Sequence, residues 1–230
     1  GAQVAGLVWS NGTDTAFEGV DPLPAGHRLV WEQGRTHVER FWRAPTAPER
    51  HPMDATEAAL ALRALLGKAV LERMGSGTTS VWMSGGWDSS AVFAAGQHAL
   101  EETERSRLRP VSISYPEGDP GREDDFIREL AGRWDADVHW IDSDQIPLLD
   151  RLEERAALTD EPPVHLYELW NRELARGSRA VGARVALDGC GGDNLFQVSD
   201  VILADLLRTG RLFEPGDAAD LRRLFELHGD

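Results

Sequence analysis

The sequence predicts an α/β protein with a parallel sheet, preceded by a short β-rich segment. Two observations lead to this prediction. From about residue 54 onward, short apolar runs alternate with stretches whose apolar residues repeat at helical spacing, and this alternation is typical of a parallel sheet with helices on both faces. Two of the predicted strands also run directly into glycine-rich segments that carry aspartates. In such sheets ligands bind beyond the carboxyl ends of the strands.

The first 43 residues read as short strands and turns. An extended apolar stretch over residues 4–9 precedes the hairpin-type turn Asn11-Gly12, and residues 22–26 form a further predicted turn. Residues 43–52 contain three prolines among charged residues, which indicates a linker. We therefore expect two parts, residues 1–45 and residues 50–230.

The second part shows strands and helices in alternation. Asp54 and Glu57 have the spacing of a capping box, and the helix that they begin carries Leu62 and Leu65 in its apolar repeat and stops at Gly75. The later predicted elements are strand 80–83, helix 88–100, strand 111–115, helix 123–134, strand 138–141, helix 166–176, strand 184–187 and helix 198–207. The apolar face of helix 123–134 is expected to include Phe126, Ile127, Leu130, Ala131 and Trp134.

Composition limits the partners and the compartment. The formal net charge of −15 predicts a surface that repels phosphate backbones, so we expect no nucleic-acid partner. No apolar run approaches membrane-spanning length and no signal peptide is evident, so we expect no membrane association. Cys190 is the single cysteine, which excludes an internal disulfide and favours a cytoplasmic protein. We expect Cys190 itself to be a small packed residue.

The first glycine-rich segment, residues 84–90, reads Ser-Gly-Gly-Trp-Asp-Ser-Ser and lies between a predicted strand and a predicted helix. Glycines let backbone N–H groups converge on a phosphate, the start of a helix adds its dipole, and serine hydroxyls add donors. Asp88 suits a ligand to Mg²⁺ that bridges phosphate oxygens. The structural alternative is a tight turn in which Asp88 caps the helix.

The second glycine-rich segment, residues 188–193, reads Asp-Gly-Cys-Gly-Gly-Asp and follows another predicted strand. Two such loops at one edge of one sheet predict a cleft for a metal and a triphosphate. A plain glycine-rich connection would explain the glycines but not the repeated carboxylate. The other nucleotide signatures are missing, because no G-x-x-x-x-G-K-[ST] occurs and Asn194 replaces the last glycine of G-x-G-x-x-G.

These motifs resemble those of the asparagine synthetase superfamily. Residues 84–90 match its SGGxDSS pyrophosphate loop, residues 189–196 match its GxGxDxxF loop, and residues 111–115 match the strand whose backbone borders the adenine. The resemblance implies an ATP-pyrophosphatase-type domain (adenine nucleotide alpha hydrolase-like) that uses ATP and Mg²⁺. The implied ATP- and pyrophosphate-binding residues are Ser84, Gly85, Gly86, Asp88, Ser89, Ser90, Ser112, Gly189, Gly191 and Gly192. Asp88 and Asp193 are the implied metal ligands.

Residues 15–27 look like the end of the family's glutaminase-like (Ntn-type) N-terminal domain, so residues 1–45 are expected to be its tail. That glutaminase uses an N-terminal cysteine, whereas Cys190 lies in the second loop, so we expect no glutamine hydrolysis by this chain. Lys68, the only lysine, does not match the family lysine that assists amide formation. We therefore expect the acceptor-side catalytic residues beyond residue 230 and an ATP-binding domain that is C-terminally incomplete.

Residues 191–200, following Asp160-Glu161-Pro162, are most similar to the corresponding segments of lasso peptide macrolactam cyclases. This resemblance implies an ATP-dependent carbon–nitrogen ligase that forms an isopeptide amide through an acyl-adenylate and releases AMP and pyrophosphate. Its partners would be a peptide or small-molecule carboxylate, together with a leader-peptide-binding protein and a protease of the same pathway. The alternatives are an asparagine synthetase (ammonia- or glutamine-dependent), a β-lactam-synthetase-like enzyme, and a non-catalytic nucleotide-binding scaffold.

Overall fold

The computed structural model describes residues 17–43, 53–101, 103, 107–148, 151–158 and 168–196. Its centre is a four-stranded parallel sheet with the strand order β5-β4-β3-β6. The strands are β3 (Thr78–Trp82), β4 (Arg109–Ser114), β5 (His139–Asp142) and β6 (Ala183–Leu187). The prediction of an α/β protein with a parallel sheet is thus confirmed.

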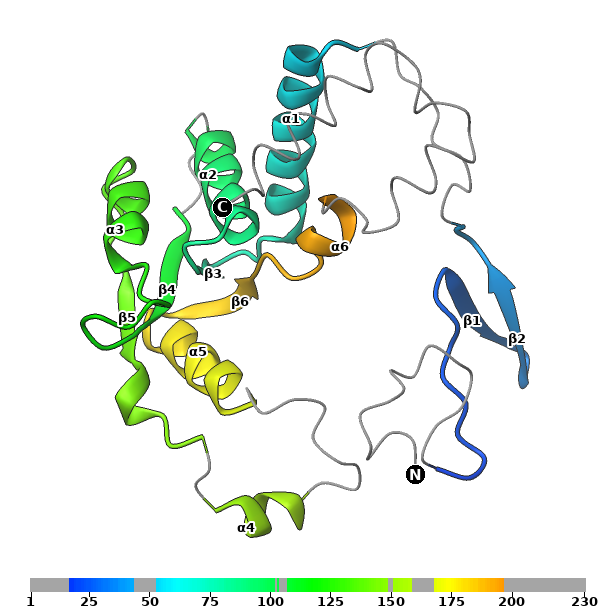
Figure 1. Cartoon of the computed structure of the whole chain (residues 1–230). Coiled ribbons are helices and arrows are strands. Elements are labelled where there is room, and N and C mark those ends of the chain that lie inside the picture. The colour runs from blue at the N-terminus through cyan, green and yellow to red at the C-terminus, as the bar shows by residue number, and fades with distance from the viewer. Residues whose placement is uncertain are drawn as a thin grey trace, which may run out of the picture.

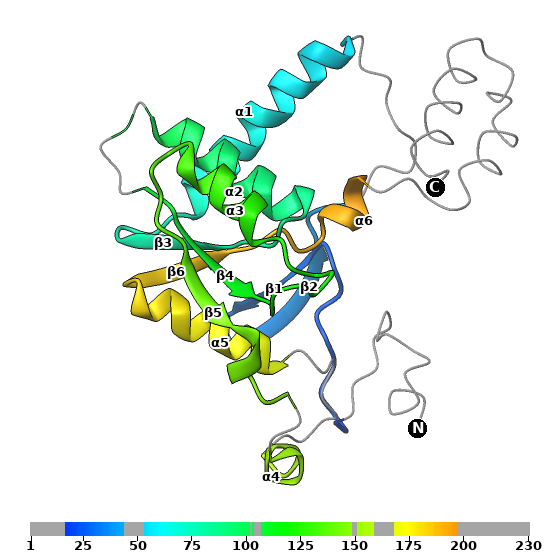
Figure 2. The same cartoon turned by 60° about the vertical axis from the view of Figure 1, so that its left-hand side comes forward.

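Helices cover both faces of this sheet (Figures 1 and 2). On one side lie α1 (Ala55–Arg73), α2 (Trp87–Leu100) and α3 (Asp124–Gly132), and on the other lies α5 (Glu168–Ala180). The shorter helical elements are the 3-10 turn η1 (Ser143–Gln145), α4 (Leu152–Ala156) and α6 (Gly192–Phe196). In the described part of the chain, no helix combines the length and hydrophobicity that crossing a bilayer requires.

A separate antiparallel hairpin precedes the sheet. Its strands β1 (His27–Glu32) and β2 (Arg35–Arg40) are joined through Gln33 and Gly34, which both have positive φ, 50° and 78°. Two such residues in succession are typical of the tight hairpin turns that match strand twist. The predicted strand 4–9, the turn Asn11-Gly12 and helix 198–207 lie outside the described residues.

Helix α1 begins where the sequence predicts, but it packs differently. The capping box is present, because Glu57 N–H donates to Asp54 Oδ1 (2.8 Å) and Asp54 N–H donates to Glu57 Oε2 (3.2 Å). The expected apolar repeat is only partly buried: Leu62 and Leu65 are exposed. Contact with α2 instead passes through Gly67, where an added Cβ would lie 3.0 Å from Ala99 Cβ and 3.2 Å from the Ala95 carbonyl oxygen.

The core lies between the sheet and the layer formed by α1, α2 and α3. Phe93 of α2 is fully buried and meets the Trp134 ring edge-on at 5.9 Å between centroids. Around it pack Val70, Met74, Val81, Met83, Leu100, Leu108 and Ile127. Phe126 departs from the predicted apolar face of α3, because its side chain is half exposed while Ile127 is buried.

Helix α5 approaches the opposite face of the sheet through small residues. A Cβ at Gly177 would lie within 3.0 Å of His139, Val111 and Ile141 side-chain atoms, so no larger residue fits there. The next residue, Ser178, is buried and accepts hydrogen bonds from Ser80 Oγ (2.8 Å) and Trp82 Nε1 (2.9 Å). These contacts hold α5 against the face of the sheet opposite to α1, α2 and α3.

Candidate functional site

The strand order brings the two glycine-rich loops together. The chain runs from β3 outward to β4 and β5, and then returns to β6 on the other side of β3. The point where the order reverses therefore lies between β3 and β6, which is where ligands bind in open parallel sheets. The first loop leaves the carboxyl end of β3 and the second leaves the carboxyl end of β6. Both predicted loops thus begin at this reversal point.

The first loop is closed by the hydroxyl of Ser89. This buried hydroxyl accepts a hydrogen bond from Ser84 N–H (3.1 Å) and donates one to the Ser84 carbonyl (3.1 Å). Helix α2 begins within this segment, at Trp87, with Gly86 as its N-cap residue and without a side-chain cap. The alternative in which Asp88 caps the helix is therefore wrong, since Asp88 already lies within the first turn.

Ser90 differs from Ser89 in its bonding. The residue is 9% exposed, and its buried hydroxyl has no hydrogen-bond partner among the described residues. Buried hydroxyls are nearly always hydrogen-bonded in folded proteins, but Ser90 does not line the adjacent cavity, whereas Ser84, Asp88 and Ser89 do. Ser89 therefore both closes the loop and lines the cavity, and Ser90 does neither.

The second loop packs directly on the first. A Cβ at Gly189 would lie 2.5 Å from the backbone nitrogen of Ser89, and one at Gly192 would collide with the Asp88 carboxylate. Inside the loop, Gly192 N–H donates to the Gly189 carbonyl (3.1 Å), and Cys190 N–H donates to Asp188 Oδ1 (3.0 Å). The glycines therefore let the two backbones approach closely. Cys190 is exposed, so the expectation of a packed cysteine is wrong.

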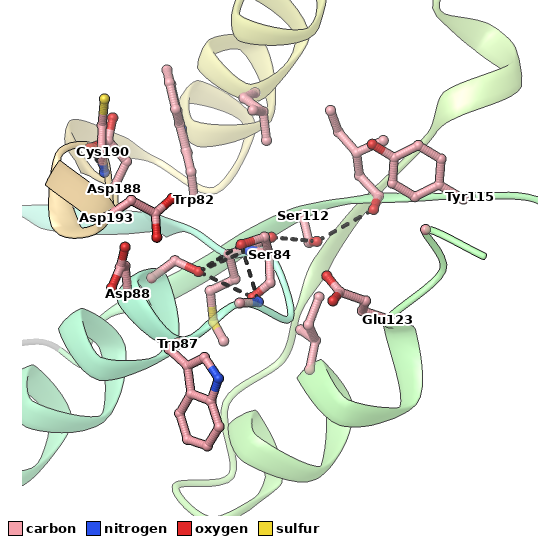
Figure 3. Close-up of a pocket in the computed structure, with 18 residues that line it drawn as sticks. Trp82, Ser84, Trp87, Asp88, Ser112, Tyr115, Glu123, Asp188, Cys190 and Asp193 are labelled. Atoms are coloured by element: carbon pink, nitrogen blue, oxygen red, sulfur yellow. Dashed lines mark hydrogen bonds between the residues drawn. The ribbon is translucent and has the colours of Figure 1, made fainter. Parts of the chain in front are cut away.

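Three aspartates lie on one side of Ser84, namely Asp88 from α2, and Asp188 and Asp193 from the second loop (Figure 3). Among the described residues, no group of three His, Cys, Asp or Glu side chains could hold a metal ion alone. Mg²⁺ bound to a nucleotide needs only one or two carboxylates, because phosphates and waters supply the other ligands. Asp88 and Asp193 both line the cavity, and their carboxylates are the type of donor that such a metal takes.

The cavity between the loops and the sheet has a volume of about 560 Å³, within the usual range of about 300–1,000 Å³ for small-molecule sites. Its apolar wall includes Met83, Ile113, Ile127 and Leu174. Ser112 also lines it, but the hydroxyl of this buried residue donates to the Met83 carbonyl (2.7 Å). The Ser112 hydroxyl proton is therefore already used, and its oxygen keeps only the capacity to accept a hydrogen bond.

The structure adds one side chain that sequence reasoning missed. Glu123, the residue before α3, lines the cavity on the other side of Ser84 from the aspartates (Figure 3). Its Oε2 accepts a hydrogen bond from Gly85 N–H at 2.7 Å. The available signal was positional, because Glu123 follows the carboxyl end of β4 and so emerges at the same edge of the sheet as the two loops.

Comparison with known proteins identifies a family. The model of the asparagine synthase family matches residues 61–226. Curated relatives include "Amidase chry2" of Gibberella zeae, 24% identical over 212 residues that cover 86% of this chain and 32% of the relative. "Amidase chyE" of Penicillium rubens is 27% identical, with coverages of 86% and 32%. "Asparagine synthetase [glutamine-hydrolyzing] 3" of Bacillus subtilis is 25% identical over 64% of this chain and 25% of the relative. The chain thus spans a third or less of the length of these relatives.

Proposed function

Because the chain belongs to the asparagine synthase family, we propose that it forms the ATP-binding part of an ATP-dependent carbon–nitrogen ligase. The observation that carries this proposal is the close packing of two glycine-rich, aspartate-bearing loops at the strand reversal, beside a cavity that both Asp88 and Asp193 line. A plain structural turn would not need the second carboxylate. The distant relatives named as amidases and as an asparagine synthetase agree with amide chemistry in general.

In the proposed reaction, a substrate carboxylate oxygen attacks the α-phosphorus of ATP. The bond from that phosphorus to the β-bridging oxygen breaks, and pyrophosphate leaves with the electron pair. An amine then attacks the acyl carbon of the adenylate, AMP leaves, and the amine loses its proton. Enclosure in one cavity would hold the two reactants at a high effective concentration.

The proposed phosphate contacts come from both loops. Ser84 and Gly86, which line the cavity, would donate to pyrophosphate oxygens, while Ser89 keeps the first loop closed. Asp88 and Asp193 would hold Mg²⁺, which neutralises charge that develops on the leaving pyrophosphate. Gly189, Gly191 and Gly192 would allow the second loop to approach the phosphates, because side chains there would fill the gap between the loops or strain the backbone. Gly191, with φ of 91°, is the position that requires glycine for its conformation.

For the substrate, we propose a peptide in which an Asp or Glu side chain is activated and the N-terminal amine of the same peptide attacks. The support is the sequence of residues 191–200 together with Asp160-Glu161-Pro162, which resembles that of lasso peptide macrolactam cyclases. The second candidate is transfer of ammonia to a free carboxylate, as the name of the Bacillus subtilis relative suggests. The two candidates share the adenylation step and differ in the source of the nitrogen.

One experiment separates these possibilities. The complete protein that contains this chain is incubated with ATP, Mg²⁺ and a precursor peptide, or with aspartate and ammonia. We expect ATP–pyrophosphate exchange, release of AMP, and a peptide product lighter by one water. Efficient asparagine formation without peptide cyclisation would favour the second candidate. Nucleotide binding without exchange would contradict the ligase proposal and leave the nucleotide-binding scaffold, and absence of both would contradict the two readings alike. Asp88→Asn should abolish Mg²⁺-dependent turnover in any of the enzymatic cases.

A further inference from the structure

Glu123 places a carboxylate on the first loop at a position where a phosphate ligand would be expected. Its Oε2 lies 2.7 Å from the backbone nitrogen of Gly85. A Cβ added at Gly85 would lie 2.5 Å from Glu123 Cβ and 2.6 Å from its carboxyl carbon, so the whole side chain rests against the loop backbone. The Gly85 N–H of the first loop is thus already paired with an anion that belongs to the protein.

The position of Glu123 is fixed by its neighbours rather than by its own side chain. The next residue, Asp124, is 2% exposed, and its Oδ2 accepts from Ser114 Oγ (2.6 Å). The same oxygen pairs with Arg122 (3.0 Å) and Arg128 (3.3 Å). Arg122 also donates to the Tyr115 carbonyl (2.7 Å), and the Arg128 guanidinium lies over the Trp140 ring. This network holds the start of α3 against the end of β4, and the Glu123 side chain leaves from that rigid point.

The placement has an electrostatic consequence for any anion that enters. A phosphate group that reaches Gly85 N–H must displace the carboxylate, and the two negative charges then remain neighbours. Asp88 adds a further negative charge from the other side of the loop (Figure 3). A ligand that brings a divalent cation supplies the missing positive charge, whereas a bare anion does not.

We propose that Glu123 is a specificity-determining residue that makes the first loop select metal-bound nucleotide over metal-free phosphate anions. This inference rests on the proposed nucleotide-binding function of the same loop. Glu123 acts by repulsion: it weakens binding of the wrong ligand rather than strengthening binding of the right one. The charge pattern favours ATP with its Mg²⁺ over free ATP or inorganic pyrophosphate.

The test compares dissociation constants of a non-hydrolysable ATP analogue in Mg²⁺ and in EDTA, by calorimetry on the complete protein. Glu123→Gln removes the charge and keeps an acceptor for Gly85 N–H. The matched control is Asp125→Asn, which removes one charge from the same end of α3, where the Asp125 carboxylate pairs with Arg128 in solvent (2.8 Å). Glu123→Ala, which also removes the acceptor, provides a second variant. Thermal unfolding of each variant verifies that it is folded.

We expect Glu123→Gln and Glu123→Ala to bind the analogue in EDTA about tenfold more tightly than the wild type, since the exposed carboxylate is partly screened by solvent. Binding in Mg²⁺ should change by less than about threefold, because the cation compensates the charge. Asp125→Asn should behave as the wild type. Equal tightening in both media, weaker binding of the Glu123 variants, or no difference from Asp125→Asn would each overturn the inference. A wild type that binds no nucleotide would instead overturn the proposed function.

Discussion

Gly189→Ala should separate the two loops and thereby impair the proposed nucleotide site. The added Cβ would lie 2.5 Å from the Ser89 nitrogen, 2.8 Å from Asp88 Cβ and 2.9 Å from the Asp88 carbonyl carbon. Ordinary contact begins at 3.4 Å. Two of these neighbours are backbone atoms, so no rotation of a side chain can relieve the collision. The loops themselves must move apart by about 1 Å.

The size of the effect follows from this displacement. Overpacking of a tight contact costs about 1–3 kcal/mol of stability. The second loop lies at the surface and ends in exposed residues, so part of the strain can be released by moving the loop outward; we expect about 1 kcal/mol. Function should suffer more, because a displacement of about 1 Å between binding groups can reduce activity by about 100-fold. Asp193, the second proposed metal ligand, would move away from Asp88.

The assay is urea unfolding together with ATP–pyrophosphate exchange in the complete protein. The control is Gly132→Ala in α3, where an added Cβ meets no atom within 4 Å and φ is not in the left-handed region. This control should be neutral or slightly stabilising, because alanine loses less entropy than glycine on folding. If Gly189→Ala retains wild-type exchange, the close approach of the two loops is not required for nucleotide binding.

Three further predictions concern the scaffold. Asp124→Asn should reduce the free energy of unfolding by about 3 kcal/mol, because it breaks a buried ion pair with two arginines. In the same urea titration, the control Asp125→Asn should change this free energy by no more than about 0.5 kcal/mol. Equal losses in the two variants would contradict the role of the network. Phe93→Ala should lose about 3–5 kcal/mol and shift the tryptophan emission, because it removes a fully buried ring that packs on Trp134; a loss below about 1 kcal/mol would show that the site collapses. The hydrogen bond from Trp134 Nε1, followed by His98, lowers the pKa of Glu101. A carboxyl whose pKa is lower in the folded state stabilises the protein above its unfolded-state pKa, and this stability is lost as the pH falls through its folded-state pKa. Glu101→Gln should therefore remove one acidic step from the plot of melting temperature against pH. Identical plots for the variant and the wild type would refute this.

The sequence predicts the sheet well because its strands are short apolar runs whose burial depends on local pattern. The same local logic finds the α1 capping box, since Asp54 and Glu57 need only each other. It fails where packing depends on small residues. Helix α1 meets α2 through Gly67, and α2 accommodates Val70 and Leu108 against Gly96, so the contact surface is marked by the absence of side chains rather than by leucines. Leu62 and Leu65 therefore stay exposed despite their helical spacing.

The candidate site also contains residues that sequence can predict and one that it cannot. The two loops can be found from sequence because glycines and aspartates follow strands, and parallel strands end at one edge. Glu123 cannot be found in this manner, because it stands in a run with Asp124 and Asp125 that reads as an ordinary acidic helix start. Which of these three carboxylates faces the loop, which is buried and which lies in solvent depends on how α3 docks against β4. That docking is set by Arg122 and Arg128, and local pattern does not reveal it.

The charges around the cavity make metal and nucleotide binding interdependent under the proposed function. Asp88 and Asp193 on one side of Ser84, and Glu123 on the other, repel a bare triphosphate. Each ligand therefore lowers the electrostatic penalty for the other. Linkage requires the factor by which Mg²⁺ tightens nucleotide binding to equal the factor by which nucleotide tightens Mg²⁺ binding. If Glu123 supplies part of that coupling, its removal must reduce the factor by the same amount whether it is measured from nucleotide binding or from Mg²⁺ binding. A carboxylate that only shapes the loop would alter the affinities and leave the factor unchanged.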